Sequence, residues 1–213
     1  MARTLRWAPL LVPLLLPAAE SRVVVGAFSE GTLEGWQPER FDGETAYRLS
    51  RVDGRRALRA ESDDAASGLY REKTVDLTET PILNWRWRVE NTLGRLDERS
   101  KGGDDYPARV YVVFSGGIFF WKTRAINYVW SNHQPVGSTW ENAFTGNARM
   151  IAVRSGPEET GRWLGQSRNV RADYRRLFGE DVERADAVAI MTDTDNAGGR
   201  AVAYYGDIWF SGK

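Results

Sequence analysis

Residues 81–90 read PILNWRWRVE. Every second residue from Leu83 to Val89 is apolar, and the residues between them, from Asn84 to Glu90, are polar or charged. Successive side chains of a β-strand point to opposite faces, so this alternation is typical of a strand with one buried face. The stretch therefore predicts a half-buried strand whose tryptophans, Trp85 and Trp87, face a core and whose arginines face away from it.

Short alternating segments of the same kind recur along most of the chain, and Gly, Pro, Asn and Asp punctuate the gaps between them. They are RVVVGAF (22–28), RALRAES (56–62), GLYREKTV (68–75), ARVYVVF (108–114), RAINYVW (124–130), ARMIAVR (148–154), AVAIMTD (187–193) and AVAYYGDIWF (201–210). Only NVRADYRRLFG (169–179) has helical spacing, with Asn169 placed to cap it and Gly179 to end it. About nine strands and one short helix predict an all-β fold, a two-sheet antiparallel jelly-roll sandwich of the galactose-binding-like kind.

The last two strand segments flank TDNAGGR (194–200), a linker rich in Asn and Gly. Two alternating runs on either side of such a linker are typical of a β-hairpin. We therefore expect residues 187–193 and 201–210 to be antiparallel neighbours in one sheet.

Composition limits the classes of function. The 213 residues include 29 Lys and Arg against 29 Asp and Glu, so no overall positive charge attracts nucleic acid, and no nucleic-acid partner is expected. Arg3 and Arg6 precede an apolar run from Trp7 to Ala19, the order found in a secretory signal, and that run is too short for a stable membrane span. The sequence predicts a signal peptide over 1–21, a single β-sandwich domain over 22–213, and a periplasmic or secreted location.

The chain lacks the residues that most catalytic and metal-binding sites require. Cys is absent and His133 is the only histidine, which argues against a zinc site, and no G-x-S-x-G motif accompanies His133 for a serine triad. The loop DTDNAGG (193–199) resembles the start of an EF-hand but lacks the later ligands, so an Asx-type turn is the preferred interpretation. No cofactor is expected, and a structural calcium ion, if bound, would take Asp193, Asp195 and Asp207.

The outward faces of the strands carry the candidate binding residues. In 108–114, Arg109 and Tyr111 alternate with apolar residues, and Asp104 and Asp105 lie just before that strand. Arginine forks suit carboxylate and sugar oxygens, and aromatic rings offer flat surfaces to sugars. The same alternation predicts one ligand-binding face made of Arg86, Arg88, Asp104, Asp105, Arg109, Tyr111, Asn127 and Arg149. The alternative is that Asp104, Asp105 and Glu90 pair with these arginines in a polar network that binds nothing.

Several stretches resemble one known family. KGGDDYPARVYVVF, INYVW, ARMIAVRSG, RNVRADYRRLFGE and VAIMTDTDNAGGRAVAYYGDIWF are similar to an exported bacterial domain of unknown function, numbered three thousand and forty-seven, from Gly35-Trp36 to Phe210. A looser resemblance links Phe28, Gly35-Trp36 and YYGDIWF to carbohydrate-binding jelly-roll modules. It implies the fold and suggests a glycan ligand, although one fold hosts many functions.

These observations leave three alternative functions open. The preferred one is non-catalytic binding of a saccharide, an acidic one included, in the bacterial envelope or outside the cell. The first alternative is a jelly-roll polysaccharide lyase or related carbohydrate-active enzyme, for which Arg109, Tyr128, His133 and Gln134 are available. The second alternative is a structural or assembly protein of the envelope, which would bind a partner and no glycan.

Overall fold

The computed structural model describes residues 21–117 and 122–212. The predicted signal peptide lies outside them except for Ser21, so it stays a prediction, as do the domain bounds. Within the described residues the chain forms thirteen strands, the helix α1 (Val170–Phe178) and the short 3-10 turns η1 (Phe28–Glu30) and η2 (Lys101–Gly103). The strands are β1 (Arg22–Gly26), β2 (Gln37–Asp42), β3 (Ala46–Val52), β4 (Arg55–Asp63), β5 (Ala66–Asp76), β6 (Ile82–Val89), β7 (Ala108–Phe114), β8 (Arg124–Ser131), β9 (Thr139–Glu141), β10 (Ala148–Ser155), β11 (Leu164–Asn169), β12 (Arg184–Asp193) and β13 (Arg200–Ser211).

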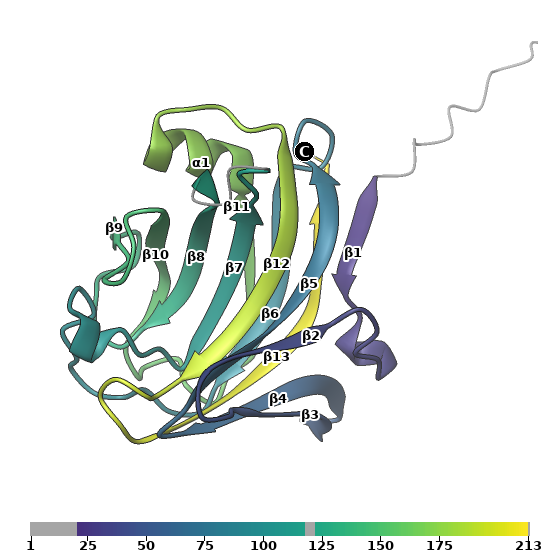
Figure 1. The fold of residues 1–213 in the computed structure, drawn as a ribbon. Helices are drawn as coiled ribbons and strands as arrows, with labels where there is room; N and C mark the ends of the chain where they lie inside the picture. The colour runs from purple at the N-terminus through teal and green to yellow at the C-terminus, as the bar shows by residue number, and fades with distance from the viewer. Residues whose placement is uncertain (1–20, 118–121, 213) are drawn as a thin grey trace, which may run out of the picture.

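The strands form two sheets packed face to face. The first sheet has the order β11-β6-β13-β4-β3, with β1 also paired to β13, and the second has the order β2-β5-β12-β7-β8-β10-β9. In Figure 1 the second sheet runs from β9 and β10 at the left to β5 at the right. Among the described strands, every pairing is antiparallel except that of β8 with β10, which is parallel. The predicted all-β, two-sheet jelly-roll sandwich with one short helix is confirmed.

The core between the sheets is rich in aromatic side chains. Trp85 and Trp87 of β6 are at most 1% exposed, and Trp85 packs against Tyr128 of β8 with ring centres 5.3 Å apart. Trp87 packs against Trp130, also on β8, with ring centres 6.0 Å apart. The predicted inward face of residues 81–90 is therefore confirmed, and large rings from both sheets fill the interior.

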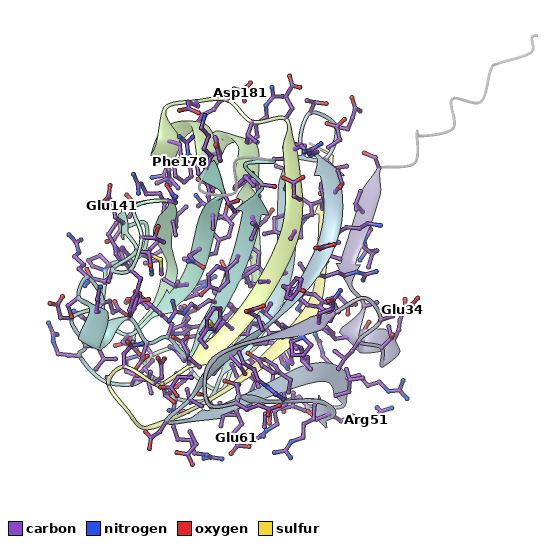
Figure 2. The ribbon with its side chains drawn as sticks, viewed as in Figure 1. Glu34, Arg51, Glu61, Glu141, Phe178 and Asp181 are labelled. Carbon is purple, nitrogen blue, oxygen red and sulfur yellow. The ribbon has the colours of Figure 1, made fainter. Side chains whose placement is uncertain are left out.

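Helix α1 begins and ends where the sequence predicts. The side chain of Asn169 accepts a hydrogen bond from the backbone N–H of Ala172, at 2.9 Å, and Gly179 adopts the left-handed conformation that ends the helix. Tyr174 and Val170 turn into the core. Phe178 and Asp181 mark this end of the sandwich in Figure 2, opposite Glu61 and Arg51 at the other end.

The predicted C-terminal hairpin is wrong. Strand β12 pairs with β5 and β7 in the second sheet, whereas β13 pairs with β4, β6 and β1 in the first. Both strands are apolar on their core side, and each can complete a different sheet. Residues 194–199 therefore carry the chain from one sheet to the other rather than folding it back.

Four strands lack the alternation that located the others. They are β2, β3, β9 and β11, and all lie at or next to sheet edges. Strand β2 is exposed along its whole length, so it has no apolar face to reveal it. Within residues 21–117 and 122–212, no helix is both long and apolar enough to cross a bilayer.

Candidate functional site

The outer face of the second sheet is hollowed into one continuous groove. Two adjoining hollows of about 340 and 400 Å³ lie over it, and both are lined by Phe41, Tyr111 and Met191. We call the smaller hollow the apolar part of the groove and the larger the polar part. The central strands β12 and β7 supply Met191 and Tyr111, so a rigid sheet forms the floor.

Small side chains open the apolar part. Gly68 of β5 and Ala187 and Ala189 of β12 line it together with Tyr70 and Val113, and their small size leaves a shallow channel across β5, β12 and β7. Phe41 of the edge strand β2 rises beside it and is 67% exposed. An exposed aromatic ring at the wall of a channel is a surface on which a flat apolar ligand face can stack.

An ion-paired arginine forms the floor of the polar part. Arg109 is 3% exposed, and its Nε donates to Asp193 Oδ1 at 2.8 Å while its Nη2 donates to Asp193 Oδ2. Its Nη1 donates to Asp104 Oδ2 at 3.3 Å, and its Nη2 also donates to the carbonyl of Asp104. Burial alone would lower the pKa of Arg109, but Tyr111 and Asp104 raise it above its ordinary value, so the guanidinium keeps its charge.

Two buried acceptor oxygens beside this arginine have no hydrogen-bond partner within residues 21–117 and 122–212. Asn142 donates to Asp104 Oδ2 at 2.9 Å, but Asp104 Oδ1 has no hydrogen-bond partner among the described residues. The same holds for Oδ1 of Asn127 on β8. Asp104 is 4% exposed and Asn127 1%, and both residues line the polar part. Buried acceptors usually have donors, so these two oxygens are a feature that a bound ligand would satisfy.

The third carboxylate of this region, Asp105, supports the loop between β12 and β13. It accepts hydrogen bonds from the backbone N–H groups of Asn196 and Ala197, at 3.1 and 2.6 Å. Asp195 lines the groove beside it, and burial raises the pKa of Asp195, with a further increase from the nearby charge of Asp105.

The proposed calcium ligands are only partly brought together. Carboxylate oxygens of Asp105, Asp193 and Asp195 lie within 4.8 Å of one another. Asp207 is elsewhere, bound to the N–H and hydroxyl of Ser29 at 2.8 and 2.5 Å, because β13 belongs to the first sheet. Asp105 and Asp193 are already occupied by Asn196, Ala197 and Arg109, so the cluster is held by the protein's own donors.

Four of the predicted site residues line the groove. Asp104, Arg109, Tyr111 and Asn127 meet in the polar part, and Asp105 lies behind it in the adjoining loop. The predicted neighbours Arg86 and Arg88 do not, and that prediction is wrong. Both are on β6, in the first sheet, and they face the opposite outer surface of the sandwich.

Those two arginines have other surroundings. Arg88 pairs with Glu90 and Asp53, at 2.6 and 2.5 Å, as the alternative interpretation expected for Glu90. Arg86 lines a separate hollow of about 370 Å³ with Trp163 and Trp209. Around Arg109, the pairing with Asp104 that the alternative predicted is present, but the second partner is Asp193, whereas Asp105 accepts from backbone N–H groups instead.

Arg149 was also assigned to the wrong face. It lies opposite Ile126 in the β8–β10 register, and Ile126 faces the core. Its guanidinium lies 5.3 Å from the ring centre of Phe178 and 2.9 Å from Glu141. Both faces of β10 are apolar, since Met150 is buried on the other side, so alternation could not distinguish them.

The residues suggested for a lyase are not gathered at one place. Arg109 lies on the outer face of β7, whereas Tyr128 is in the core, where its hydroxyl donates to Asp173 at 3.0 Å. His133 Nδ1 lies 3.9 Å from the buried Glu98. Sequence reasoning, in turn, missed Phe41, Phe144 and Asn142. The signal for the two rings was available, because ERFDGE (39–44) and ENAFTGN (141–147) each place one aromatic residue in an otherwise polar stretch.

Comparisons with known proteins bear on the family and the fold. A family model described as a protein of unknown function, DUF3047, matches residues 34–209. The chain belongs to this family. No curated protein matches the sequence.

Among solved structures, the family 30 carbohydrate-binding module of a cellulosomal cellulase of Clostridium thermocellum is similar, with 10% identity, 91% of this chain and 98% of that chain covered, and a TM-score of 0.53. The family 11 carbohydrate-binding module of another cellulosomal cellulase of that organism has 11% identity, with 92% and 97% covered, and a TM-score of 0.49. At such identity, the first likeness shows a shared fold.

Proposed function

We propose that this member of the DUF3047 family binds a saccharide, without cleaving it, in the groove of the second sheet. The observation that carries the proposal is the combination of exposed rings and buried polar groups in one channel. Phe41 and Phe144 are 67% and 55% exposed, and Tyr111 lies between the two parts of the groove. Sugars present apolar ring faces and polar edges, and such a channel offers a surface for each.

The fold supports this proposal by analogy. The similar module of TM-score 0.53 is a carbohydrate-binding module by its printed name, and a sheet-floored groove holds a ligand without needing catalytic groups. We also propose that the protein acts in the envelope or outside the cell. The support is the signal-like order of residues 1–21, and a mature protein that retains Met1 by mass spectrometry would contradict it.

The function is tested by blocking the groove without touching the core. Ala189 of β12 is partly exposed in the apolar part, so Ala189→Trp should fill the channel and leave the fold intact. Binding to a panel of oligosaccharides, measured by calorimetry, should then fall at least about tenfold. The matched control is Arg86→Ala on the opposite face, which should bind as the parent does. A parent protein that binds no oligosaccharide, or an Ala189→Trp variant with full affinity, would contradict the proposal.

A further inference from the structure

We propose that the ligand of the polar part is an amino sugar with a free ammonium group, and that the groove rejects acidic saccharides. The inference rests on the proposed function and specifies its substrate class. It reverses the expectation, drawn from the arginines of the sequence, that an acidic saccharide is among the ligands.

The charges that line the groove favour a cationic ligand over an anionic one. The side chains that line the two parts of the groove include one guanidinium, that of Arg109, and five carboxylates: Glu39, Glu72, Asp104, Asp193 and Asp195. The ammonium group of Lys101 lies outside this lining, 5.4 Å from the ring centre of Phe144, and offsets one of these charges. A groove with such an excess of carboxylates attracts cations and repels uronates.

The arginine has little left to offer an anion. A guanidinium has five N–H donors, and the contacts of Arg109 to Asp193 and Asp104 use four of them, one on Nε, one on Nη1 and two on Nη2. Asn142 likewise donates to Asp104. The feature that suggested an acidic ligand is therefore satisfied within the protein.

The unsatisfied polar atoms of the polar part are hydrogen-bond acceptors. Asp104 Oδ1 and Asn127 Oδ1 are buried, line the polar part and have no donor among the described residues. An ammonium group carries three donors and no acceptor, so it matches this arrangement better than a hydroxyl or a carboxylate does. The rings of Tyr111 and Phe144 in the same lining add a favourable surface for a cation.

The test uses ligands that differ at one position. Hexamers of β-1,4-linked glucose, N-acetylglucosamine and glucosamine share a backbone and carry a hydroxyl, an acetamide and an ammonium at C2. Calorimetry at low salt and a mildly acidic pH should give the glucosamine hexamer an affinity about tenfold above that of the glucose hexamer, because charged hydrogen bonds are roughly twice as strong as neutral ones. Added salt should reduce the difference, and an oligogalacturonate should not bind.

Two variants locate the effect. Asp195→Asn removes a groove carboxylate that forms no hydrogen bond or ion pair with Arg109 among the described residues, and it should lower the ratio of glucosamine-hexamer to glucose-hexamer affinity about threefold. Asn127→Leu removes an acceptor that has no partner in the described part of the chain, so the melting temperature of the variant should not fall, whereas glucosamine binding should weaken about fivefold. A merely structural Asn127 would show the opposite pattern.

The outcomes separate the two proposals. If no oligosaccharide binds, the proposed function fails and this inference with it. If the glucose hexamer or the oligogalacturonate binds as tightly as the glucosamine hexamer, the proposed function stands and the amino-sugar inference is overturned. The amino-sugar inference is also overturned if a double variant, Asp195→Asn with Asn127→Leu, keeps the full preference for the amine, because the groups that select the amine would then lie elsewhere.

Discussion

Replacing Arg109 by Ala would leave two buried carboxylates without their cation. The side chains of Asp193 and Asp104 are 1% and 5% exposed, and each loses two hydrogen-bonded contacts to the guanidinium, one of them through the Asp104 carbonyl. Removing one partner of a buried ion pair costs about 3–5 kcal/mol. We expect Arg109→Ala to lower the free energy of unfolding by this amount, measured by urea titration of tryptophan fluorescence.

A double variant tests whether the loss comes from the unpaired charge. Arg109→Met combined with Asp193→Leu replaces the pair with apolar side chains, and such replacements of buried pairs are often neutral. The double variant should therefore be more stable than Arg109→Met alone, by about 2 kcal/mol or more. Arg86→Ala, on the exposed face of β6, should change stability by less than about 0.5 kcal/mol. The reasoning is refuted if Arg109→Ala costs less than about 1 kcal/mol. It is also refuted if the stability losses of Arg109→Met and of Asp193→Leu, each measured alone, simply add up to the loss of the double variant.

Two further predictions concern the ends of the sandwich. Hydrogen bonds from Arg59 and Arg200 lower the pKa of Glu61 from 4.5 to about 2, so its ionised form stabilises the fold above about pH 4.5 and this stabilisation is lost as the pH falls toward 2. Glu61→Gln should therefore flatten the decline of melting temperature over that range, and an unchanged acid profile would contradict this origin. At the helix, Asn169→Ala removes the side chain that caps the N–H of Ala172 and should lower the free energy of unfolding by about 1 kcal/mol. Asn169→Ser should keep most of that stability, because serine also caps helices. Equal losses in both variants would argue against capping.

The alternation of apolar and polar residues predicted which face of its strand a side chain occupies better than it predicted which strands are neighbours. It placed Trp85 and Trp87 in the core and Tyr111 on the outer face of β7, because the side-chain period of a strand is a local property. It could not tell which sheet a strand joins, since that depends on contacts far apart in sequence. Hence Arg86 was assigned to the face of Arg109, and β12 and β13 to one hairpin.

The groove was predicted only where strands build it. Asp104, Arg109, Tyr111 and Asn127 were found because they lie on or beside alternating segments. The two exposed rings, Phe41 and Phe144, come from an edge strand that is polar throughout and from a loop after β9, where no period exists. Their position over the sheet follows from tertiary packing, and only their isolation among polar residues marks them in the sequence.

The place of β13 in the first sheet affects how the chain can fold. This last described strand lies between β6 and β4, and it also pairs with β1, where Arg22 lies opposite Ser211. The centre of this sheet therefore forms only after β13 has been made, and its strands pair over long sequence separations. Such topologies fold slowly, because long loops must close before their contacts are gained. During synthesis, the apolar faces of β4 and β6 must wait for their shared partner, so this period is when the chain is most exposed to aggregation.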